Sequence, residues 1–424
     1  MRSNKITNIL RNEYVISVFI KILMLVIGML HSAFLARFLG TELKGVAATV
    51  TSTVALLQVI ITCGIHQAYP YFKKEGKIDR FKEVFINNVY FIYLLLLALI
   101  IVVALEYGSS FSLKYIFILL LTPLFAYENV VSYVYLIENP VKKNLWSLYS
   151  AFFETLFIIF LWLFTNPNNF NMVLAISIAV LVRAISSTIG LGVKPDITQI
   201  SVRFVIKMLR YGLLPMLALI LTVMNSKIDI LMMDWNGSVT SASIGLYSVG
   251  VGVADKILAI PDAIREILLS KLVSGKSEQE VARVTRLSVF FCVIVAIGIA
   301  LFGKLILQIL YGAAYLGAYN VLVISSCGTV FMVFLKMISQ YNIVNRRQLA
   351  NLLMLALSVI TNMLFNVILI PHYGIEGAAI ASFLGHFVCA ICFISYFAKT
   401  TSFGLKKILL PQKEDFGILL RRNT

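Results

Sequence analysis

Long uninterrupted runs of apolar residues dominate the chain and recur at short intervals along it. Each run has the length of about 20 residues that an α-helix needs to cross the hydrocarbon of a bilayer. Twelve such runs are predicted to be membrane-spanning helices, at residues 14–36, 45–69, 84–105, 113–137, 145–164, 171–192, 211–233, 242–268, 287–310, 316–340, 349–370 and 377–398.

Charged residues are scarce, and their scarcity sets the class of protein. Of the 424 residues, 60% are hydrophobic and 13% are charged, whereas soluble domains carry about 45–50% apolar and about 25% charged residues. A soluble core could not bury this much apolar surface. The chain is therefore predicted to be an all-α integral membrane protein, with about twelve helices in two six-helix lobes around a central cavity.

Lysine and arginine residues are concentrated in alternate connections between the predicted spans. With the N-terminus placed inside, the outer loops hold only Arg37, Lys44 and Lys114 among the basic residues, as the positive-inside rule requires. The predicted location is the inner membrane of a bacterium, with both termini in the cytoplasm. The net charge of +16 then faces anionic lipid from short loops, so nucleic acid is not an expected partner.

Side chains that catalyse reactions or bind metals show none of the spacings that such sites require. The five cysteines lie inside apolar runs, and the four histidines are scattered. No phosphate-binding glycine loop and no nucleophile–base pair is evident. We therefore expect no cofactor, no metal and no enzymatic activity, ATP hydrolysis included.

The spans divide evenly into two halves of similar length that look like a parallel repeat. Arg203, Lys207 and Arg210 fall on one face of the segment between the halves, which is typical of a helix lying at a membrane surface. Repeats of this kind are typical of transporters that rock two lobes around a midplane cavity. We expect an N-terminal lobe at 1–192, an inner interfacial linker helix at 193–210, a C-terminal lobe at 211–398 and a basic cytoplasmic tail at 399–424.

An ordered series of short motifs runs along nearly the whole chain. It comprises Leu39-Gly40-Thr41-Glu42, Tyr211-Gly212 with Pro215 and Asp229, Gly245-Leu246-Tyr247-Ser248, Ile260-Pro261-Asp262, Leu310-Tyr311-Gly312, and Asn362 and Asn366 followed by Ile370-Pro371 and Gly377-Ala378-Ala379. In order and spacing, the series resembles the bacterial O-antigen or Wzx-type polysaccharide flippases. These belong to the multidrug/oligosaccharidyl-lipid/polysaccharide exporter superfamily.

The resemblance implies a flippase that moves an undecaprenyl-diphosphate-linked oligosaccharide repeat unit from the cytoplasmic to the periplasmic leaflet by alternating access. The product would be O-antigen in lipopolysaccharide biosynthesis, or a similar surface polysaccharide. Membrane lipid, a polysaccharide polymerase and a chain-length regulator are the further partners that it implies. Because sugar and diphosphate cannot cross hydrocarbon unaided, the cavity should be wet, should present cations to the diphosphate and should open sideways for the prenyl tail.

Polar side chains within the spans are the candidate ligands. A charge at the bilayer centre costs about 2.5–3.5 kcal/mol on insertion scales, so it should face a cavity or a partner. Lys21 is expected either to line the inner half of the cavity or to extend to the inner interface. Lys227 and Asp229 lie about 200° apart around the seventh span, while Asn225 and Asp229 share a face. That face is expected to look inward, with Asp229 either binding a coupling cation or pairing structurally.

Further charges occupy the eighth and tenth spans. Asp255 and Lys256 lie in the middle of the eighth span, and one of them is expected to face the seventh. Lys336 lies near the inner end of the tenth span, where it lines the cavity or extends to the interface. Both lysines are candidate substrate ligands, as Lys227 is, and Asp255 is a candidate for ion coupling.

Three more ionisable residues lie in the fourth, fifth and sixth spans. Glu154 and Arg183 have equal depth on consecutive spans, and they are expected to form an ion pair unless Arg183 binds the diphosphate. Glu128 has no evident partner in the sequence, and is either a protonated carboxyl or a proton-coupling site. Glu128 and Glu154 are therefore further candidates for ion coupling.

Two other classes of protein fit part of this pattern. A cation-coupled multidrug antiporter of the same superfamily would have a less cationic cavity and an ion site centred on carboxylates. A membrane polysaccharide polymerase would usually need a larger outer loop that carries acid–base residues, whereas the outer loops here are short. Lipid II flippases are close relatives by fold, but they generally have two further spans.

Overall fold

The computed structural model describes residues 13–76, 80–107, 112–273, 278–401, 403–404, 408–409 and 412. Over these residues the chain forms α-helices and short 3₁₀ helices, without a strand. A helix satisfies its own backbone hydrogen bonds, as a chain in hydrocarbon must. The expected all-α class is thereby confirmed.

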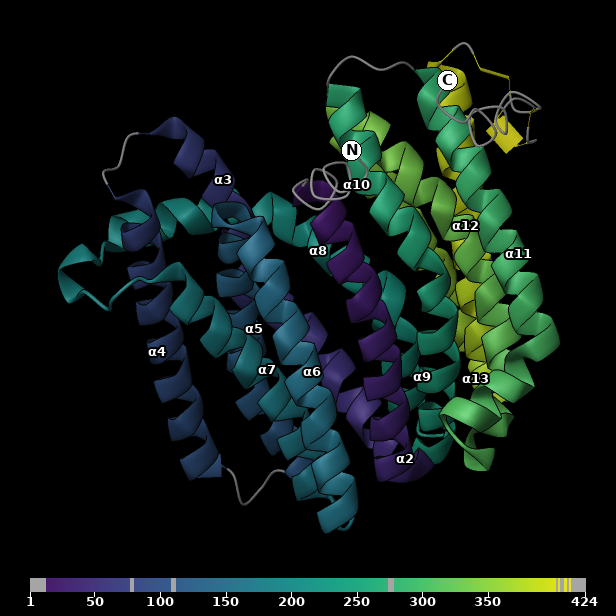
Figure 1. Ribbon diagram of the computed structural model, residues 1–424, viewed down its shortest axis with the longest axis horizontal. Helices are drawn as coiled ribbons and strands as arrows, with labels where there is room; N and C mark the ends of the chain where they lie inside the picture. Colours follow the sequence, from purple (N-terminus) through teal and green to yellow (C-terminus); the bar gives the residue numbers. More distant parts are fainter. Residues whose placement is uncertain are drawn as a thin grey trace, which may run out of the picture. The chain divides into compact units, whose positions relative to one another are not determined.

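The chain divides into two compact units, Met1–Val223 and Met224–Thr424, and each is described by itself. The first holds α2 (Glu13–Thr62), α3 (Ile65–Glu75), α4 (Phe81–Tyr107), α5 (Leu113–Glu138), α6 (Pro140–Phe164), α7 (Asn169–Leu191), η2 (Ile197–Gln199) and the start of α8 (Val202–Asn236) (Figure 1). The second holds the rest of α8, α9 (Ser241–Ala254), η3 (Asp255–Leu258), α10 (Ala259–Val273), α11 (Glu278–Leu310), η4 (Ala313–Ala318), α12 (Tyr319–Val344) and α13 (Gln348–Thr400).

The division between the units falls inside α8, later in the chain than the linker expected at 193–210. Helix α8 begins at Val202 and continues as one element to Asn236. The second half of the segment expected to form a separate interfacial helix is therefore the first part of a longer helix.

Ten helices in the described part are long and apolar enough to cross a membrane, compared with the twelve that the sequence predicts. Two of them, Ile22–Glu75 and Gln348–Thr400, have 54 and 53 residues. As a straight helix at 1.5 Å per residue, each would be roughly 80 Å long, more than twice the hydrocarbon thickness of about 30 Å. Both are interrupted, because the backbone leaves the helical conformation at Gly40 (φ 67°, ψ 178°) and at Gly374 (φ 54°, ψ −127°). These breaks coincide with the connections expected after the first and eleventh spans.

Glycine permits the sharp break in α13. A positive φ is strained for residues that carry a Cβ, so Gly374 can adopt it more readily than other residues. Pro371, inside the same helix, cannot donate a backbone hydrogen bond and weakens the helix just before the break. After the break the two arms of α13 lie close together, since a Cβ at Gly377 would lie 2.3 Å from the Leu369 carbonyl oxygen.

The first unit has two apolar cores. Helix α2 packs along α5 and α6, and α5 packs on α7; Figure 1 shows α2 beside α6. One core gathers aromatic side chains around Tyr69, Phe85 and Phe204, and the other lies between α2, α5, α6 and α7. Large apolar side chains also cover the outer faces, where Leu99 and Phe164 are 60% and 72% exposed. Such faces are suited to lipid as the solvent.

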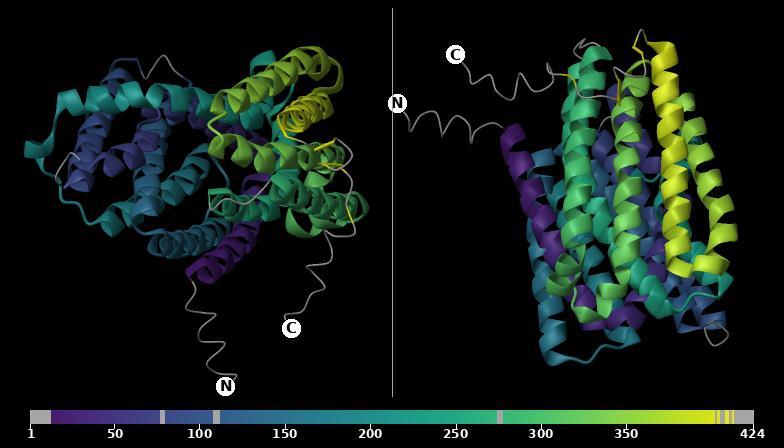
Figure 2. Two further views of the ribbon diagram at one scale, coloured as in Figure 1. Left: turned by 90° about the horizontal axis from the view of Figure 1, so that it is seen from above. Right: turned by 90° about the vertical axis from the view of Figure 1, so that its right-hand side faces the viewer.

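Helix α12 is the centre of the second unit. It packs against α9, α10, α11 and α13, and Figure 2 shows α11, α12 and α13 side by side in its right-hand view. Helices α9 and α10 are separated by the 3₁₀ turn η3, so the eighth expected span is interrupted in its middle. A 3₁₀ segment within a helix often marks a functional position.

Helix α8 meets the junction of α2 and α3 through a backbone contact within the first unit. Cys63 and Gly64 form the turn between α2 and α3, with φ values of 46° and 64°. A Cβ at Gly212 of α8 would lie 2.1 Å from the Cys63 carbonyl oxygen, and a Cβ at Gly64 would lie 2.5 Å from the Gly212 carbonyl oxygen. Both positions therefore require glycine for this approach.

We predict that Gly212→Ala lowers the stability of the protein, because the added methyl group forces the two backbones apart. The expected loss is about 1–3 kcal/mol, the usual cost of overpacking. The measurement is the midpoint of thermal unfolding in detergent, followed by tryptophan fluorescence. Gly298→Ala in α11 is the matched control, since a Cβ there meets open space and should stabilise the helix by about 0.5–1 kcal/mol. An unchanged or higher midpoint for Gly212→Ala would contradict the close contact.

Candidate functional site

A triad of charged side chains ties three helices of the first unit together. The Arg183 Nη1 atom of α7 lies 2.8 Å from the Glu154 Oε1 atom of α6, and the Arg183 Nε atom lies 3.7 Å from the Glu128 Oε1 atom of α5. The ion pair expected between Glu154 and Arg183 is therefore present. Glu128, for which the sequence offered no partner, shares the same guanidinium group.

The charge of this triad bears on its chemistry. Two carboxylates and one guanidinium sum to −1 when both carboxyl groups are ionised. The Glu154 side chain is 7% exposed and the Arg183 side chain is 34% exposed. Such a group is better suited to hold a proton or to fix the helices than to attract a diphosphate.

Lysine side chains gather around the break between α9 and α10 in the second unit. Asp255 and Lys256 of η3 are exposed, and Lys227, Lys256 and Lys336 all lie within electrostatic range of the Asp255 carboxylate. The Lys336 Nζ atom of α12 lies 2.6 Å from the Asp262 Oδ1 atom of α10. We call these five residues the lysine cluster. Its three ammonium groups and two carboxylates leave a net charge of +1.

Asp229 of α8 lies at the centre of a buried polar network in the second unit. Its side chain is 4% exposed, and it accepts hydrogen bonds from the Tyr247 hydroxyl at 2.8 Å, the Ser382 hydroxyl at 2.5 Å and the Asn366 amide at 2.7 Å. Among the described residues it has no ion-pair partner. A buried carboxylate held only by neutral donors leaves its negative charge uncompensated.

The groups around Asp229 offer oxygen atoms to a cation. Asn366 also donates to the Asn362 Oδ1 atom, and Asn362 donates to the Ser382 Oγ atom at 3.1 Å. The Asn366 Oδ1 atom is buried and has no hydrogen-bond partner in the part of the chain that the structure describes. Carboxylate, amide and hydroxyl oxygens suit small hard cations. We call Asp229, Tyr247, Asn362, Asn366 and Ser382 the Asp229 network.

The described residues include no group of three or more His, Cys, Asp or Glu side chains that could bind a metal ion. Among these residues, the oxygen atoms of the Asp229 network are therefore the best candidates for a cation site.

Asn225 lies one turn before Asp229, and both side chains are buried within the second unit. Its Oδ1 atom accepts a hydrogen bond from the Ser358 hydroxyl at 3.0 Å, and Ser358 also reaches the Gly385 carbonyl oxygen at 2.9 Å. Asn225 thus extends the polar interior from α8 to α13.

Several residues of this interior were not among the site residues expected from the sequence. They are Tyr247, Ser358, Asn362, Asn366 and Ser382. Asn362 and Asn366 are one helical turn apart within an apolar run, a spacing that could have indicated a polar face. Lys21 lies in α2, but its side chain is outside those that the structure describes.

The sequence matches a known family over most of its length. The family model described as polysaccharide biosynthesis protein matches residues 34–320, more than half of the chain. An uncharacterized membrane protein of Methanocaldococcus jannaschii is 36% identical over 95 residues, which cover 22% of this chain and 18% of that protein. The aligned part is therefore a small fraction of that relative.

Solved structures of flippases and transporters share the fold. The lipid II flippase MurJ in an inward closed conformation has a TM-score of 0.73 at 14% identity, over 93% of this chain and 89% of that chain. A multidrug resistance MATE family transporter of the MOP superfamily, in an inward-facing conformation, has a TM-score of 0.65 at 15% identity, over 93% of this chain and 99% of that chain. A structure of such a transporter in an outward-facing conformation has a TM-score of 0.61 at 17% identity, over 94% of this chain and 98% of that chain. The chain belongs to the polysaccharide biosynthesis protein family of membrane proteins, and it has the fold shared by MurJ and the MATE transporters.

Proposed function

We propose that this protein is a flippase that moves an undecaprenyl-diphosphate-linked oligosaccharide repeat unit across the inner membrane, from the cytoplasmic to the periplasmic leaflet. The observation that carries the proposal is the lysine cluster, whose cations, one exposed and two partly buried, lie within candidate spans of a polysaccharide biosynthesis protein. Because lysine is costly in lipid, this surface fits water and an anionic substrate. A lipid-linked substrate is also in keeping with the name of the lipid II flippase that shares the fold.

Within the lysine cluster, Lys227 and Lys256 are the strongest candidates to bind the diphosphate. Among the described residues, neither forms an ion pair as short as that between Lys336 and Asp262, so their charges are less fully compensated by a neighbouring carboxylate. Lys336 would mainly hold α10 and α12 together. We assign Arg183 a positioning role in the first unit because two carboxylates already share it. Lys21 remains a candidate ligand on sequence grounds.

The Asp229 network is proposed as the site of a coupling cation. Asp229 also lies within electrostatic range of Asp255, so a cation or proton that neutralises Asp229 makes the surroundings of the lysine cluster more positive. Cation binding should therefore strengthen the binding of an anionic substrate, and by linkage the substrate should strengthen cation binding to the same extent. Glu128, Glu154 and Asp255 are alternative sites at which a proton could couple to transport.

A cation-coupled multidrug antiporter is the second candidate function. The oxygen atoms around Asp229 and the MATE-like fold favour it. The match to a polysaccharide biosynthesis family and the excess of lysine beside η3 favour the glycan substrate. The test below separates the two candidates.

The proposed function is tested by deleting the gene in its source organism. Surface polysaccharide and lipid-linked intermediates are measured on each leaflet. We expect single repeat units to accumulate on the cytoplasmic side and wild-type protein to restore export. Unpolymerised units on the periplasmic side would instead identify a polymerase. Unchanged polysaccharide together with increased sensitivity to drugs would identify an antiporter.

The lysine cluster provides a second prediction. Lys227→Gln and Lys256→Gln should each lower the rate of export about tenfold, because a hydrogen bond to a charged group contributes about 1.5–3 kcal/mol. The rates are compared at equal amounts of membrane-inserted protein. Lys142→Gln serves as the control, since Lys142 is exposed at the start of α6 and should not affect export. Equal export by all three variants would remove the lysine cluster from the substrate site.

The Asp229 network provides a third prediction. Sodium chloride should raise the thermal unfolding midpoint of the wild type above its value in choline chloride, because a ligand at 100 times its dissociation constant stabilises the folded state by about 2.7 kcal/mol. Asp229→Asn should abolish this difference, since it removes the charge and nearly preserves the shape. Asp196→Asn, in the connection before η2, should retain the difference. A midpoint that lacks cation dependence at every pH would leave no coupling site at Asp229.

A further inference from the structure

His31 and the triad of the first unit form one group of ionisable side chains. Arg183 pairs with Glu154 at 2.8 Å and with Glu128 at 3.7 Å, and the His31 ring lies within electrostatic range of the Arg183 guanidinium. The His31 Nδ1 atom is buried and has no hydrogen-bond partner among the described residues. The group therefore draws one ionisable side chain from each of α2, α5, α6 and α7.

All four helices enter the same apolar core directly beside this group. Leu35 of α2, Phe125 of α5, Ile158 of α6 and Ile176 of α7 belong to that core. Each lies three to seven residues from the ionisable side chain of its helix, on the same helical face. The two carboxyl groups therefore adjoin a region of low dielectric constant, where an uncompensated charge is costly.

The positive charge in direct contact with the two carboxyl groups comes from one guanidinium. Among the described residues, further interactions join Lys44 to His31, and Ser132 and Lys143 to Glu128. Arg183 carries a single positive charge and forms ion pairs with both carboxylates. When both carboxyl groups are ionised, the second negative charge is therefore compensated mainly at longer range, by Lys143.

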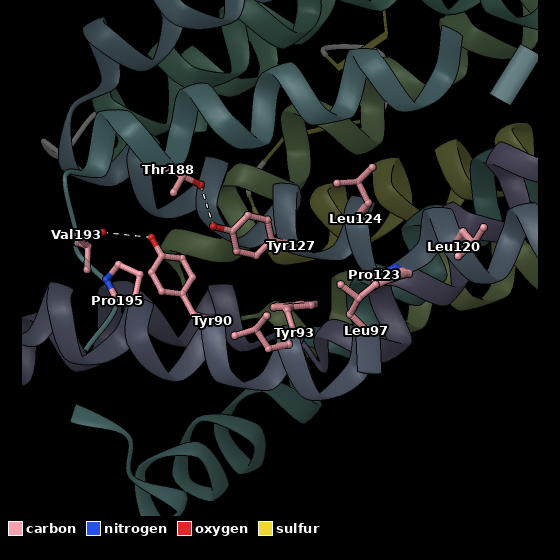
Figure 3. Close-up of a pocket in the computed structure, with 11 residues that line it drawn as sticks. Tyr90, Tyr93, Leu97, Leu120, Pro123, Leu124, Tyr127, Thr188, Val193 and Pro195 are labelled. Carbon is pink, nitrogen blue, oxygen red and sulfur yellow. Dashed lines mark hydrogen bonds between the residues drawn. The ribbon is translucent and has the colours of Figure 1, made fainter. Parts of the chain in front are cut away.

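The opposite face of α5 brings no charge to the group. Tyr127, the residue before Glu128, lines a pocket between α4, α5 and α7 that has no charged side chain among its described lining residues (Figure 3). The Tyr127 hydroxyl shares a hydrogen bond of 2.8 Å with the Thr188 hydroxyl of α7. This neutral contact holds α5 against α7 beside the ion pairs, and so opposes a separation of the helices that would relieve the excess negative charge.

We propose that Glu128 and Glu154 share one bound proton at neutral pH, so that the first unit contains a proton-binding site. The proton brings the charge of the triad from −1 to zero and turns one carboxylate into a hydrogen-bond donor. A neutral His31 offers an acceptor nitrogen in the same group. Because the two carboxyl groups lie within electrostatic range of each other, they bind the proton as a pair and not as independent sites.

This site deepens the proposed function and rests on the protein being a transporter, but not on the identity of its substrate. Loss of the proton would place a second negative charge between α5 and α6, against the apolar core. The contact between these helices therefore depends on the proton. A proton in the first unit and a cation at the Asp229 network would be separate inputs to transport.

The test is infrared difference spectroscopy of the purified full-length protein in lipid, following the C=O stretch of protonated carboxyl groups as the pH is raised from neutral. Wild type should show a titrating band that both Glu128→Gln and Glu154→Gln abolish, because the carboxylate that remains then has Arg183 to itself. Glu138→Gln is the matched control, since Glu138 also lies on α5 but pairs with Lys73 at 2.6 Å. This control should retain the band.

Arg183→Gln keeps the proposal testable if a glutamine variant of either glutamate does not fold. It removes the shared cation, so both carboxyl groups should be protonated and the band should about double. Wild type without a titrating band, a band that only one of the two glutamate variants removes, or a band that Arg183→Gln leaves unchanged would each overturn the proposal. Because no substrate is present, such a result would leave the proposed flippase function, which export of polysaccharide tests, unaffected.

Discussion

Hydrocarbon solvates charge poorly, so each ionisable side chain within a membrane span must find a partner, a bound ion or water. The structure meets this constraint in three ways. Glu128 and Glu154 share the guanidinium group of Arg183 across α5, α6 and α7. The lysine cluster gathers three lysines and two aspartates where η3 interrupts a span, and Asp255 and Lys256 of η3 are exposed. Asp229 is buried among hydroxyl and amide groups, and the proposed cation would complete its compensation.

These three solutions suggest a division of roles between the units. The triad of the first unit has no positive charge in excess, so it is suited to fixing helices or carrying a proton. The second unit combines the lysine cluster with a buried oxygen site, and Asp255 lies within electrostatic range of both the lysines and Asp229. An anionic substrate and a cation can therefore favour each other's binding without touching, which is what coupled transport requires.

Hydropathy was sufficient to predict the all-helical class, because a run of about 20 apolar residues is typical of a membrane-spanning helix. It placed connections around Gly40 and Gly374, but not the single-glycine breaks that form them, since hydropathy does not encode backbone conformation. Equal depth on adjacent spans predicted the pairing of Glu154 with Arg183. Glu128 joins them from α5 through a contact between helices that sequence spacing does not encode, and the same holds for the approach of Asn366 to Asp229.

The central claim is that the purified protein alone carries a lipid-linked oligosaccharide across a bilayer. It is tested most directly in proteoliposomes loaded with an undecaprenyl-diphosphate-linked oligosaccharide, by following how much of the glycan an externally added glycosidase can remove. The account predicts that, in vesicles with the protein, glycan from the inner leaflet becomes accessible with time, and that in protein-free vesicles about half stays protected. Equal protection with and without the protein would contradict it.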